Sequence, residues 1–265
     1  MTVVKLIDKV GDLLREAAAA AILPRFRALA ADQIIEKSPG ELVTVADREA
    51  EAIITNGLTA LLPGSLVIGE EACAANPHCL SRISNKRVWL VDPLDGTANF
   101  AAGRSTFAVM VALLERGQTV AGWLLDPVTG RLAVAEAGSG AWIAGERVRT
   151  SVDVPMVLHG AVGKFMSQAV SEAIHGRSDG LAELTPSLGC AGAEYPLVAT
   201  SGPHFAIYRR TLAWDHAPGA LFLTEAGGKV ARWDGSPYRP SEDGEGMLIA
   251  RNPDIWAKVQ ERLLA

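Results

Sequence analysis

Apolar side chains in the first sixty residues recur every three or four positions, which predicts two amphipathic helices. The first stripe consists of Leu6, Ile7, Val10, Leu13, Leu14 and Ala17, and its helix should end near Pro24. The second stripe consists of Ala50, Ile53, Ile54, Leu58 and Leu61. Thr44, followed three residues later by Asp47, has the spacing of a capping box, so the second helix should begin there and end at Pro63-Gly64. Between the two helices, Lys37-Ser38-Pro39-Gly40 is expected to be a loop.

From residue 66 onward the apolar pattern changes to short runs that are typical of strands. The predicted strands are 66–68, 87–91, 107–114, 119–125, 131–136 and 138–143. Turn sequences at Arg116-Gly117, Thr129-Gly130 and Gly145-Glu146 separate the later runs. Strands joined by such short turns pair with their neighbours in the chain, so the pattern predicts a meander that is at least partly antiparallel.

After about Thr150 strands alternate with helices, which is typical of an α/β arrangement. The predicted strands are 157–160, 205–208 and 247–250, and the predicted helices are 166–175, 193–201, 214–226 and 254–264. We therefore expect two parts. Residues 1–150 should form an N-terminal α+β half, and residues 151–265 should form a C-terminal α/β half.

The composition argues against several classes of protein. About half of the 265 residues are apolar (49%), which does not fit a disordered chain. The net charge of -5 does not fit broad nucleic-acid binding, which needs a cationic surface. No apolar run has the length of a membrane span, and the short run 17–23 follows several acidic residues, unlike a secretory signal. We expect a cytoplasmic protein with neither a nucleic-acid nor a membrane partner.

The three cysteines are Cys73, Cys79 and Cys190. Their odd number and irregular spacing do not indicate a disulfide framework, and the spacing of Cys73 and Cys79 fits no common structural zinc site. We expect free thiols in a reducing cytoplasm.

Two aspartates follow an apolar run in the most distinctive segment of the chain, Asp92-Pro93-Leu94-Asp95-Gly96-Thr97. Other acidic residues at predicted element ends are Asp47, Glu70, Glu71 and Asp215. Such carboxylates bind hard divalent cations, and together they offer enough oxygens for two or three Mg²⁺ ions, which can stabilise the attacking and leaving oxygens of phosphoryl transfer. The amides of Gly96 and Thr97 could hold a phosphate, and Thr97 could orient a water and pass its proton to Asp47.

Each of these acids alone has an ordinary structural explanation. Asp47 alone would be a helix cap, Asp95-Gly96 a turn, and Glu70-Glu71 a solvated loop end. The joint pattern favours metal-assisted phosphate chemistry over these separate explanations.

These motifs resemble the signatures of the inositol monophosphatase family. The matching segments are Lys37-Ser38-Pro39, Leu42-Val43-Thr44 with Asp47, Gly69-Glu70-Glu71, Trp89 with Asp92 to Phe100, Trp214-Asp215, and Glu225-Ala226-Gly227-Gly228. The resemblance covers nearly the whole chain. The resemblance implies a layered α-β-α-β-α sandwich of the sugar phosphatase type (inositol monophosphatase and fructose-1,6-bisphosphatase), dependence on Mg²⁺, inhibition by Li⁺, and a homodimer.

The resemblance also implies a role for each matching residue. Glu70, Asp92 and the carbonyl of Leu94 would hold a first metal ion, and Asp92, Asp95 and Asp215 would hold a second. A weaker third ion would involve Glu70 and water. The catalytic residues would be Asp47, Thr97 and Glu70, with Gly96 and Thr97 on the phosphate. Lys37 would lie near the site on a mobile loop, although a solvated lysine explains it equally well.

The match weakens around residues 189–213, which usually decide the substrate. Arg209 and Arg210 stand where relatives that favour inositol phosphate carry an acid, and Cys190 stands where a hydroxyl is usual. With Lys37 and Glu71 they are our candidate specificity residues. Arginine suits a second phosphate or a carboxylate, so the change favours a bisphosphorylated substrate such as 3′-phosphoadenosine 5′-phosphate or fructose 1,6-bisphosphate. Pairing of both arginines with surface acids is an equally good explanation.

We therefore expect a Mg²⁺-dependent phosphomonoesterase that acts on a small phosphorylated polyol, sugar or nucleotide, with inositol monophosphate as the family default. The alternatives are a 3′(2′),5′-bisphosphate nucleotidase, a fructose-1,6-bisphosphatase, or a non-catalytic regulatory protein that keeps the fold for binding. Residues 1–150 should bind metal and phosphate, and residues 151–265 should supply the last metal ligand and the substrate specificity.

Overall fold

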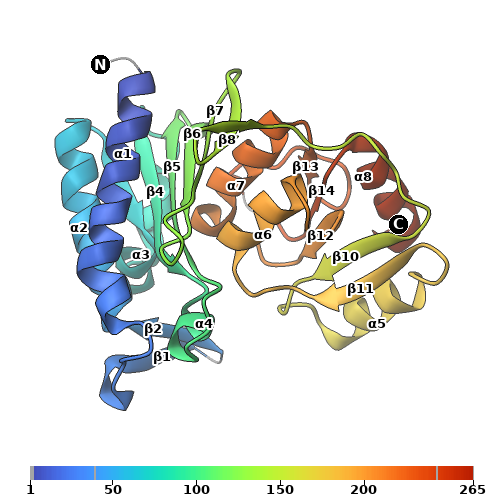
Figure 1. Cartoon of the computed structure of the whole chain (residues 1–265), viewed down its shortest axis with the longest axis horizontal. Coiled ribbons are helices and arrows are strands. Elements are labelled where there is room, and N and C mark those ends of the chain that lie inside the picture. The colour runs from blue at the N-terminus through green and yellow to red at the C-terminus, as the bar shows by residue number, and fades with distance from the viewer. Residues whose placement is uncertain (1–2, 39, 243, 265) are drawn as a thin grey trace.

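Two β-sheets alternate with three layers of helices along the long axis of the molecule (Figure 1). The computed structural model describes residues 3–38, 40–242 and 244–264. In spatial order the layers are two long N-terminal helices, a seven-stranded sheet, a central helical layer, a five-stranded sheet and two outer helices. The expected layered α-β-α-β-α fold is confirmed.

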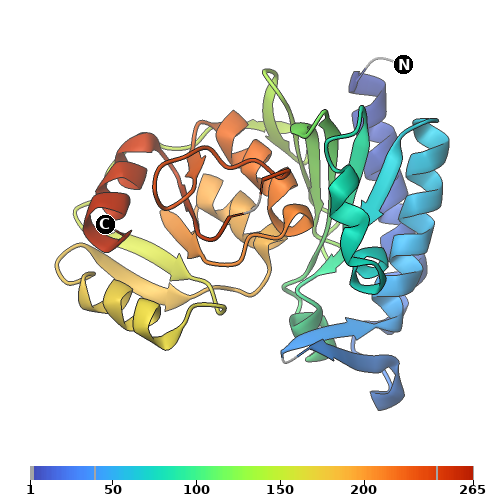
Figure 2. The same cartoon turned by 180° about the vertical axis from the view of Figure 1, so that it is seen from behind.

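The first layer consists of α1 (Val3–Ala17) and α2 (Val45–Leu61), which lie side by side in both views (Figures 1 and 2). A π-helical turn (Ala18–Ile22) and a 3-10 turn (Leu23–Arg25) continue α1, in agreement with the predicted end near Pro24. Thr44 caps α2 as predicted, because its hydroxyl accepts from the amide of Ala46 at 3.1 Å. The apolar faces of both helices pack on the sheet beneath, against Trp89 and Trp123.

The seven-stranded sheet follows the order of the chain. Its strands are β3 (Leu66–Gly69), β4 (Val88–Asp95), β5 (Ala108–Glu115), β6 (Gln118–Leu125), β7 (Leu132–Glu136), β8 (Gly140–Ile143) and β9 (Glu146–Val148). Only β3 and β4 are parallel, and every later pair is antiparallel, so the predicted meander is confirmed. Strand β9 was not predicted, because its three residues carry a single apolar side chain.

The central layer consists of α6 (Ala191–Ala199) and α7 (Ala213–Ala226), as Figure 1 shows. Helix α7 is apolar around most of its circumference because it is covered on several sides. Small residues allow this close approach. A Cβ atom on Gly219 would lie 2.1 Å from the Tyr195 ring, and one on Gly122 of β6 would lie 2.8 Å from the carbonyl oxygen of Pro218. The middle layer therefore lies directly on the seven-stranded sheet.

The second sheet and the outer helices complete the fold. Its strands, in spatial order, are β11 (Ala182–Pro186), β10 (Leu158–Val162), β12 (Phe205–Tyr208), β14 (Met247–Ala250) and β13 (Lys229–Ala231). Helix α5 (Gln168–Gly176) and helix α8 (Pro253–Val259), which continues as a π-helical turn (Gln260–Leu264), form the outer layer. The two edge strands β11 and β13 were not predicted, because both are short and partly polar. No helix in the described residues is long and apolar enough to span a membrane.

Part of the expected loop 37–40, and the segment that follows β3, have regular structure. A 3-10 turn (Ala31–Gln33) leads into a hairpin of β1 (Ile34–Ser38) and β2 (Glu41–Thr44), so Lys37 and Ser38 belong to a strand. Pro39, also in that expected loop, lies outside the described residues. Glu70 and Glu71 begin helix α3 (Glu70–Ala75), which is followed by a 3-10 helix (Pro77–Arg82). Both segments border the site described below.

The expectation of three free thiols is wrong. Cys73 and Cys79 form a disulfide, and Cys190 is the free, buried cysteine among the described residues. The physical reason is local. The turn after α3 folds the chain back and brings the two Cα atoms to 5.5 Å, which is within disulfide range. The cysteines therefore no longer support the expectation of a reducing cytoplasm.

Candidate active site

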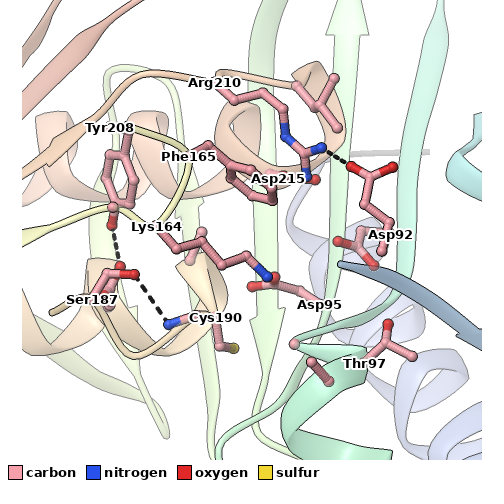
Figure 3. A pocket seen from close by; sticks show the side chains of 18 of the residues that line it. Asp92, Asp95, Thr97, Lys164, Phe165, Ser187, Cys190, Tyr208, Arg210 and Asp215 are labelled. Carbon is pink, nitrogen blue, oxygen red and sulfur yellow. Dashed lines mark hydrogen bonds and ion pairs between the residues drawn. The ribbon is translucent and has the colours of Figure 1, made fainter. Parts of the chain in front are cut away.

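Three elements bring acidic side chains to one pocket. Glu70 follows β3 directly, and Asp92 lies in β4. These strands are parallel neighbours, so their carboxyl ends meet at one edge of the sheet. Asp215 comes from the first turn of α7 in the central layer. Carboxylate oxygens of these three residues lie within 4.8 Å of one another, and Figure 3 shows Asp92 and Asp215 facing the same space.

The fourth acid, Asp95, lies beside this group but is held differently. Strand β4 was expected to end at Val91, but it continues through Asp92 to Asp95, with an irregular register between the two aspartates. Asp92 Oδ1 accepts from the amide of Leu94 at 3.0 Å, which shapes this irregularity. Asp95 Oδ2 accepts from the amide of Gly192 in α6 at 2.7 Å. Asp95 therefore connects the first sheet to the central layer within the lining of the pocket.

The pKa values of three acids in the pocket are raised, because these acids are buried close to one another. Burial, followed by the charges of Glu70, Asp95 and Asp215, raises the pKa of Asp92 well above its ordinary value. Burial, followed by the charges of Glu70 and Asp95, also raises the pKa of Asp215 well above its ordinary value. Burial raises the pKa of Asp95 to about 6. Because every donor is a hard oxygen and the charges repel one another, this set fits a divalent cation such as Mg²⁺.

A hydroxyl and a buried carboxylate lie next to the acidic group. Thr97 Oγ1 is 3.0 Å from Asp47 Oδ1 and 2.9 Å from the carbonyl oxygen of Leu94. Asp47 Oδ2 accepts from both the amide and the hydroxyl of Thr44, at 2.8 and 2.6 Å. Burial raises the pKa of Asp47 to about 7, against the opposing effect of these hydrogen bonds. Asp47 thus both begins α2 and faces the pocket through Thr97.

Gly96 forms the turn between β4 and the short helix α4 (Thr97–Ala101). Its φ of +86° favours glycine, and a Cβ atom there would lie 3.0 Å from the carbonyl oxygen of Thr106. Within the described part of the chain, nothing accepts from the amides of Gly96, Thr97 and Ala98. These three N–H groups are therefore available to an anion in the pocket.

The β1–β2 hairpin contacts the acidic group through Lys37. The ammonium of Lys37 lies 2.9 Å from Glu70 Oε1 and 2.7 Å from Glu71 Oε1. Burial opposes its charge, but the two carboxylates outweigh burial and raise the pKa of Lys37. Lys37 is thus a paired residue at the site, and the alternative of a solvated lysine is excluded.

Glu51 is a residue at this site that the motif analysis missed. Its carboxylate accepts from the amides of Glu71 and Ala72 at 2.8 and 2.9 Å, and so caps the first turn of α3. Gly69 makes room for it, because a Cβ atom there would lie 2.4 Å from the Glu51 carboxyl carbon. The sequence did contain a feature that could have identified Glu51. Glu51 lies four residues after Asp47, on the buried face of α2, where an acid needs a partner.

The C-terminal half lines the other side of the pocket. Cys190 is buried beside Asp95, and burial raises the pKa of its thiol well above the ordinary value. Behind it, Glu194 Oε2 accepts from the hydroxyl of Tyr208 at 2.5 Å, and Glu194 Oε1 accepts from the amide of Leu188. Burial raises the pKa of Glu194 to about 7. Glu194 and Tyr208 were not among the predicted site residues, although both line the pocket.

The two neighbouring arginines point in different directions. Arg210 lines the pocket, forms an ion pair with Glu41 of β2, and places its guanidinium 3.7 Å from the centre of the Phe165 ring. Arg209 instead pairs with exposed Glu245 at 3.2 Å and lies outside this pocket. The surface explanation is therefore correct for Arg209, and the position of Arg210 agrees with the alternative of a binding residue.

Comparisons with known proteins show the family to which the chain belongs. A family model described as the inositol monophosphatase family matches residues 2–265. An inositol-1-monophosphatase of Caulobacter vibrioides is 32% identical over 242 residues, which cover 88% of this chain and 91% of that protein. A Thermotoga maritima protein named fructose-1,6-bisphosphatase/inositol-1-monophosphatase is 29% identical over 204 residues, 76% of each chain. The solved structure of the extragenic suppressor protein suhB from Bartonella henselae has a TM-score of 0.81 at 26% identity, covering 96% of this chain and 98% of that one.

The match over the whole length and the shared fold therefore lead to one conclusion: the chain belongs to the inositol monophosphatase family of phosphoric monoester hydrolases.

Proposed function

We propose that this protein is a Mg²⁺-dependent phosphomonoesterase that hydrolyses a small phosphorylated molecule with an activated water. One observation carries the proposal. The carboxylates of Glu70, Asp92 and Asp215 approach within 4.8 Å of one another in the pocket that Gly96 and Thr97 also line. Sites for a divalent cation and for a phosphate therefore adjoin.

In this proposal Glu70, Asp92, Asp95, Asp215 and the carbonyl of Leu94 hold two or three Mg²⁺ ions. Bound Mg²⁺ would lower the pKa of water and stabilise charge on the phosphoryl and leaving oxygens. The amides of Gly96 and Thr97 bind the phosphate. Thr97 Oγ1, 3.0 Å from Asp47 Oδ1, orients the attacking water and passes its proton to Asp47. Glu70 would assist by holding a metal ion together with water.

The two halves of the chain have different roles in this proposal. We propose that residues 1–150 bind metal and phosphate, and that residues 151–265 supply Asp215 and the contacts with the leaving group. We also propose inhibition by Li⁺ and a homodimer, as the family resemblance implies, and a cytoplasmic location, as the sequence leads us to expect.

The substrate is proposed at the level of a class. Inositol monophosphate is the default for the family, and several relatives are named inositol-1-monophosphatase. The name of the Thermotoga relative adds fructose 1,6-bisphosphate, and Arg210 in the pocket favours such a bisphosphate or 3′-phosphoadenosine 5′-phosphate.

Phosphate release from a panel of esters tests the proposal. The panel contains inositol 1-phosphate, fructose 1,6-bisphosphate, 3′-phosphoadenosine 5′-phosphate and histidinol phosphate, each with Mg²⁺ and with EDTA. We expect release only with Mg²⁺, and we expect Asp92→Asn to abolish it. Asp12→Asn, on the exposed side of α1, is the matched control. Full activity of Asp92→Asn would sink the proposal, and no release from any ester would favour a non-catalytic binding role.

A further inference from the structure

We propose that the natural substrate carries a second anionic group, a phosphate or a carboxylate, on its leaving group, and that Arg210 and Lys164 bind this group. The inference rests on the proposed phosphatase activity and specifies its substrate class. It concerns the side of the pocket opposite Thr97, where the C-terminal half meets the acidic group (Figure 3).

Both cations are placed by the same aromatic ring. The Arg210 guanidinium lies 3.7 Å from the centre of the Phe165 ring, and the Lys164 ammonium lies 4.8 Å from it. Lys164 and Phe165 follow strand β10, and Arg210 follows strand β12, its parallel neighbour. The carboxyl ends of these two strands therefore deliver the cations to one edge, as open sheets deliver ligand-binding groups. Figure 3 shows both side chains directed into the pocket.

The charge of the pocket leaves these cations available to a substrate. In the metal-free protein both cations line the same pocket as the acids Asp95 and Asp215. Two divalent cations would neutralise the four carboxylates of the site. Arg210 would then keep Glu41 as its ion-pair partner, and Lys164 has no ion pair among the described residues.

The geometry suits an anion better than a sugar hydroxyl. Arginine and lysine only donate hydrogen bonds, so they match a phosphate or carboxylate, whereas a hydroxyl that must donate needs an acceptor. The planar guanidinium stacked on Phe165 is also held in position before the substrate arrives. Arg209, one residue earlier, is directed toward Glu245 and has no part in this site.

The test compares paired esters that differ only in the second anion. Fructose 1,6-bisphosphate is paired with fructose 1-phosphate, and 2-phosphoglycerate is paired with glycerol 2-phosphate, so the two pairs distinguish a phosphate from a carboxylate. For each pair we measure the ratio of kcat/KM with and without the second anion. We expect the wild-type ratio to exceed about 10 in at least one pair, the usual effect of a charged hydrogen bond.

Arg210→Ala and Lys164→Ala should each reduce this ratio about tenfold. The reduction should come mainly from a higher KM for the ester that carries the second anion, while kcat for that ester changes little. Arg209→Ala is the matched control and should keep the wild-type ratio. Arg210→Lys, which keeps a charge but loses the planar fork, should give an intermediate ratio. A wild-type ratio near 1 in both pairs, or a ratio that neither alanine variant changes, overturns the inference. Absence of phosphate release from all four esters contradicts the phosphatase proposal instead.

Discussion

The carboxylate of Glu51 accepts a hydrogen bond from the backbone amide of Glu71 at 2.8 Å, although the two residues belong to different helices. A second bond to the amide of Ala72 makes Glu51 the cap of helix α3. Glu70, a proposed metal ligand, is the first residue of that helix, so Glu51 helps to fix its position. Glu51 is not itself one of the proposed ligands. It is therefore a positioning residue.

We expect Glu51→Ala to weaken Mg²⁺ binding about tenfold, because α3 loses two charged hydrogen bonds at its first turn. Isothermal titration calorimetry with Mg²⁺ measures this directly. Glu51→Gln, which keeps one accepting oxygen, should have an intermediate affinity. Glu49→Ala, on the exposed side of α2, is the control and should bind as the wild type does. Wild-type affinity in Glu51→Ala would contradict the positioning role.

Removal of one acid from the repelling group should stabilise the metal-free protein. In EDTA at neutral pH, we expect Asp92→Asn to raise Tm by about 3–6 °C, because burial and the neighbouring carboxylates make ionisation of Asp92 costly and asparagine does not ionise. With Mg²⁺ the order should reverse, since the wild type gains stability from the bound ion and the variant does not. Differential scanning fluorimetry in both conditions is the measurement. A lower Tm for the variant in EDTA would show that the acids do not destabilise the empty site.

The buried Asp47 should make the metal-free protein less stable as the pH rises. Its pKa is about 7 in the folded protein against 3.8 for the ordinary side chain, so the unfolded chain loses its proton first. The stability from protonated Asp47 is present below pH 4 and is lost as the pH rises to about 7. Over that range the wild type should lose up to about 4 kcal/mol relative to Asp47→Asn. Urea unfolding in EDTA at several pH values tests this, and parallel pH curves would contradict it.

The hydroxyl of Thr97 should matter more than its methyl group. We expect Thr97→Ala to lower kcat by a factor of about 10² to 10⁴, the usual range for loss of proton transfer by a positioned group. Thr97→Ser keeps the oxygen that lies 3.0 Å from Asp47 and should stay within about tenfold of the wild type. Steady-state phosphate release, with Mg²⁺ affinity measured in parallel, separates catalysis from binding. Equal losses in both variants would assign the effect to packing.

Local signals in the sequence predicted most of the fold. The Thr44–Asp47 spacing located the start of α2 because a capping box depends only on nearby residues. Strands β12 and β14 were predicted with the correct bounds, since each is a fully buried apolar run. Short edge strands such as β13 were missed because their pairing partners, not their own residues, make them strands.

In the candidate site, too, residues whose role depends on partners distant in the chain could not be predicted from the sequence. The acids and Gly96-Thr97 were identified because their spacing along the chain is characteristic. Glu51 was missed because its partners lie in another helix, and its hydrogen bonds exist only in the folded protein. Sequence alone also did not distinguish Arg209 from Arg210, which have the same chemistry and opposite surroundings. The disulfide between Cys73 and Cys79 depends likewise on a turn that no spacing rule describes.

The three clustered carboxylates span two layers of the fold, since Glu70 and Asp92 come from the first sheet and Asp215 comes from helix α7. The chain must therefore place residue 215 against residues 70 and 92 before the full set of ligands exists. A cation bound by this set stabilises the finished native state more than the partly ordered transition state. Its kinetic effect is then to slow unfolding while leaving the folding rate nearly unchanged. If the protein meets proteases, an ion bound at this set would lengthen the lifetime of the native chain.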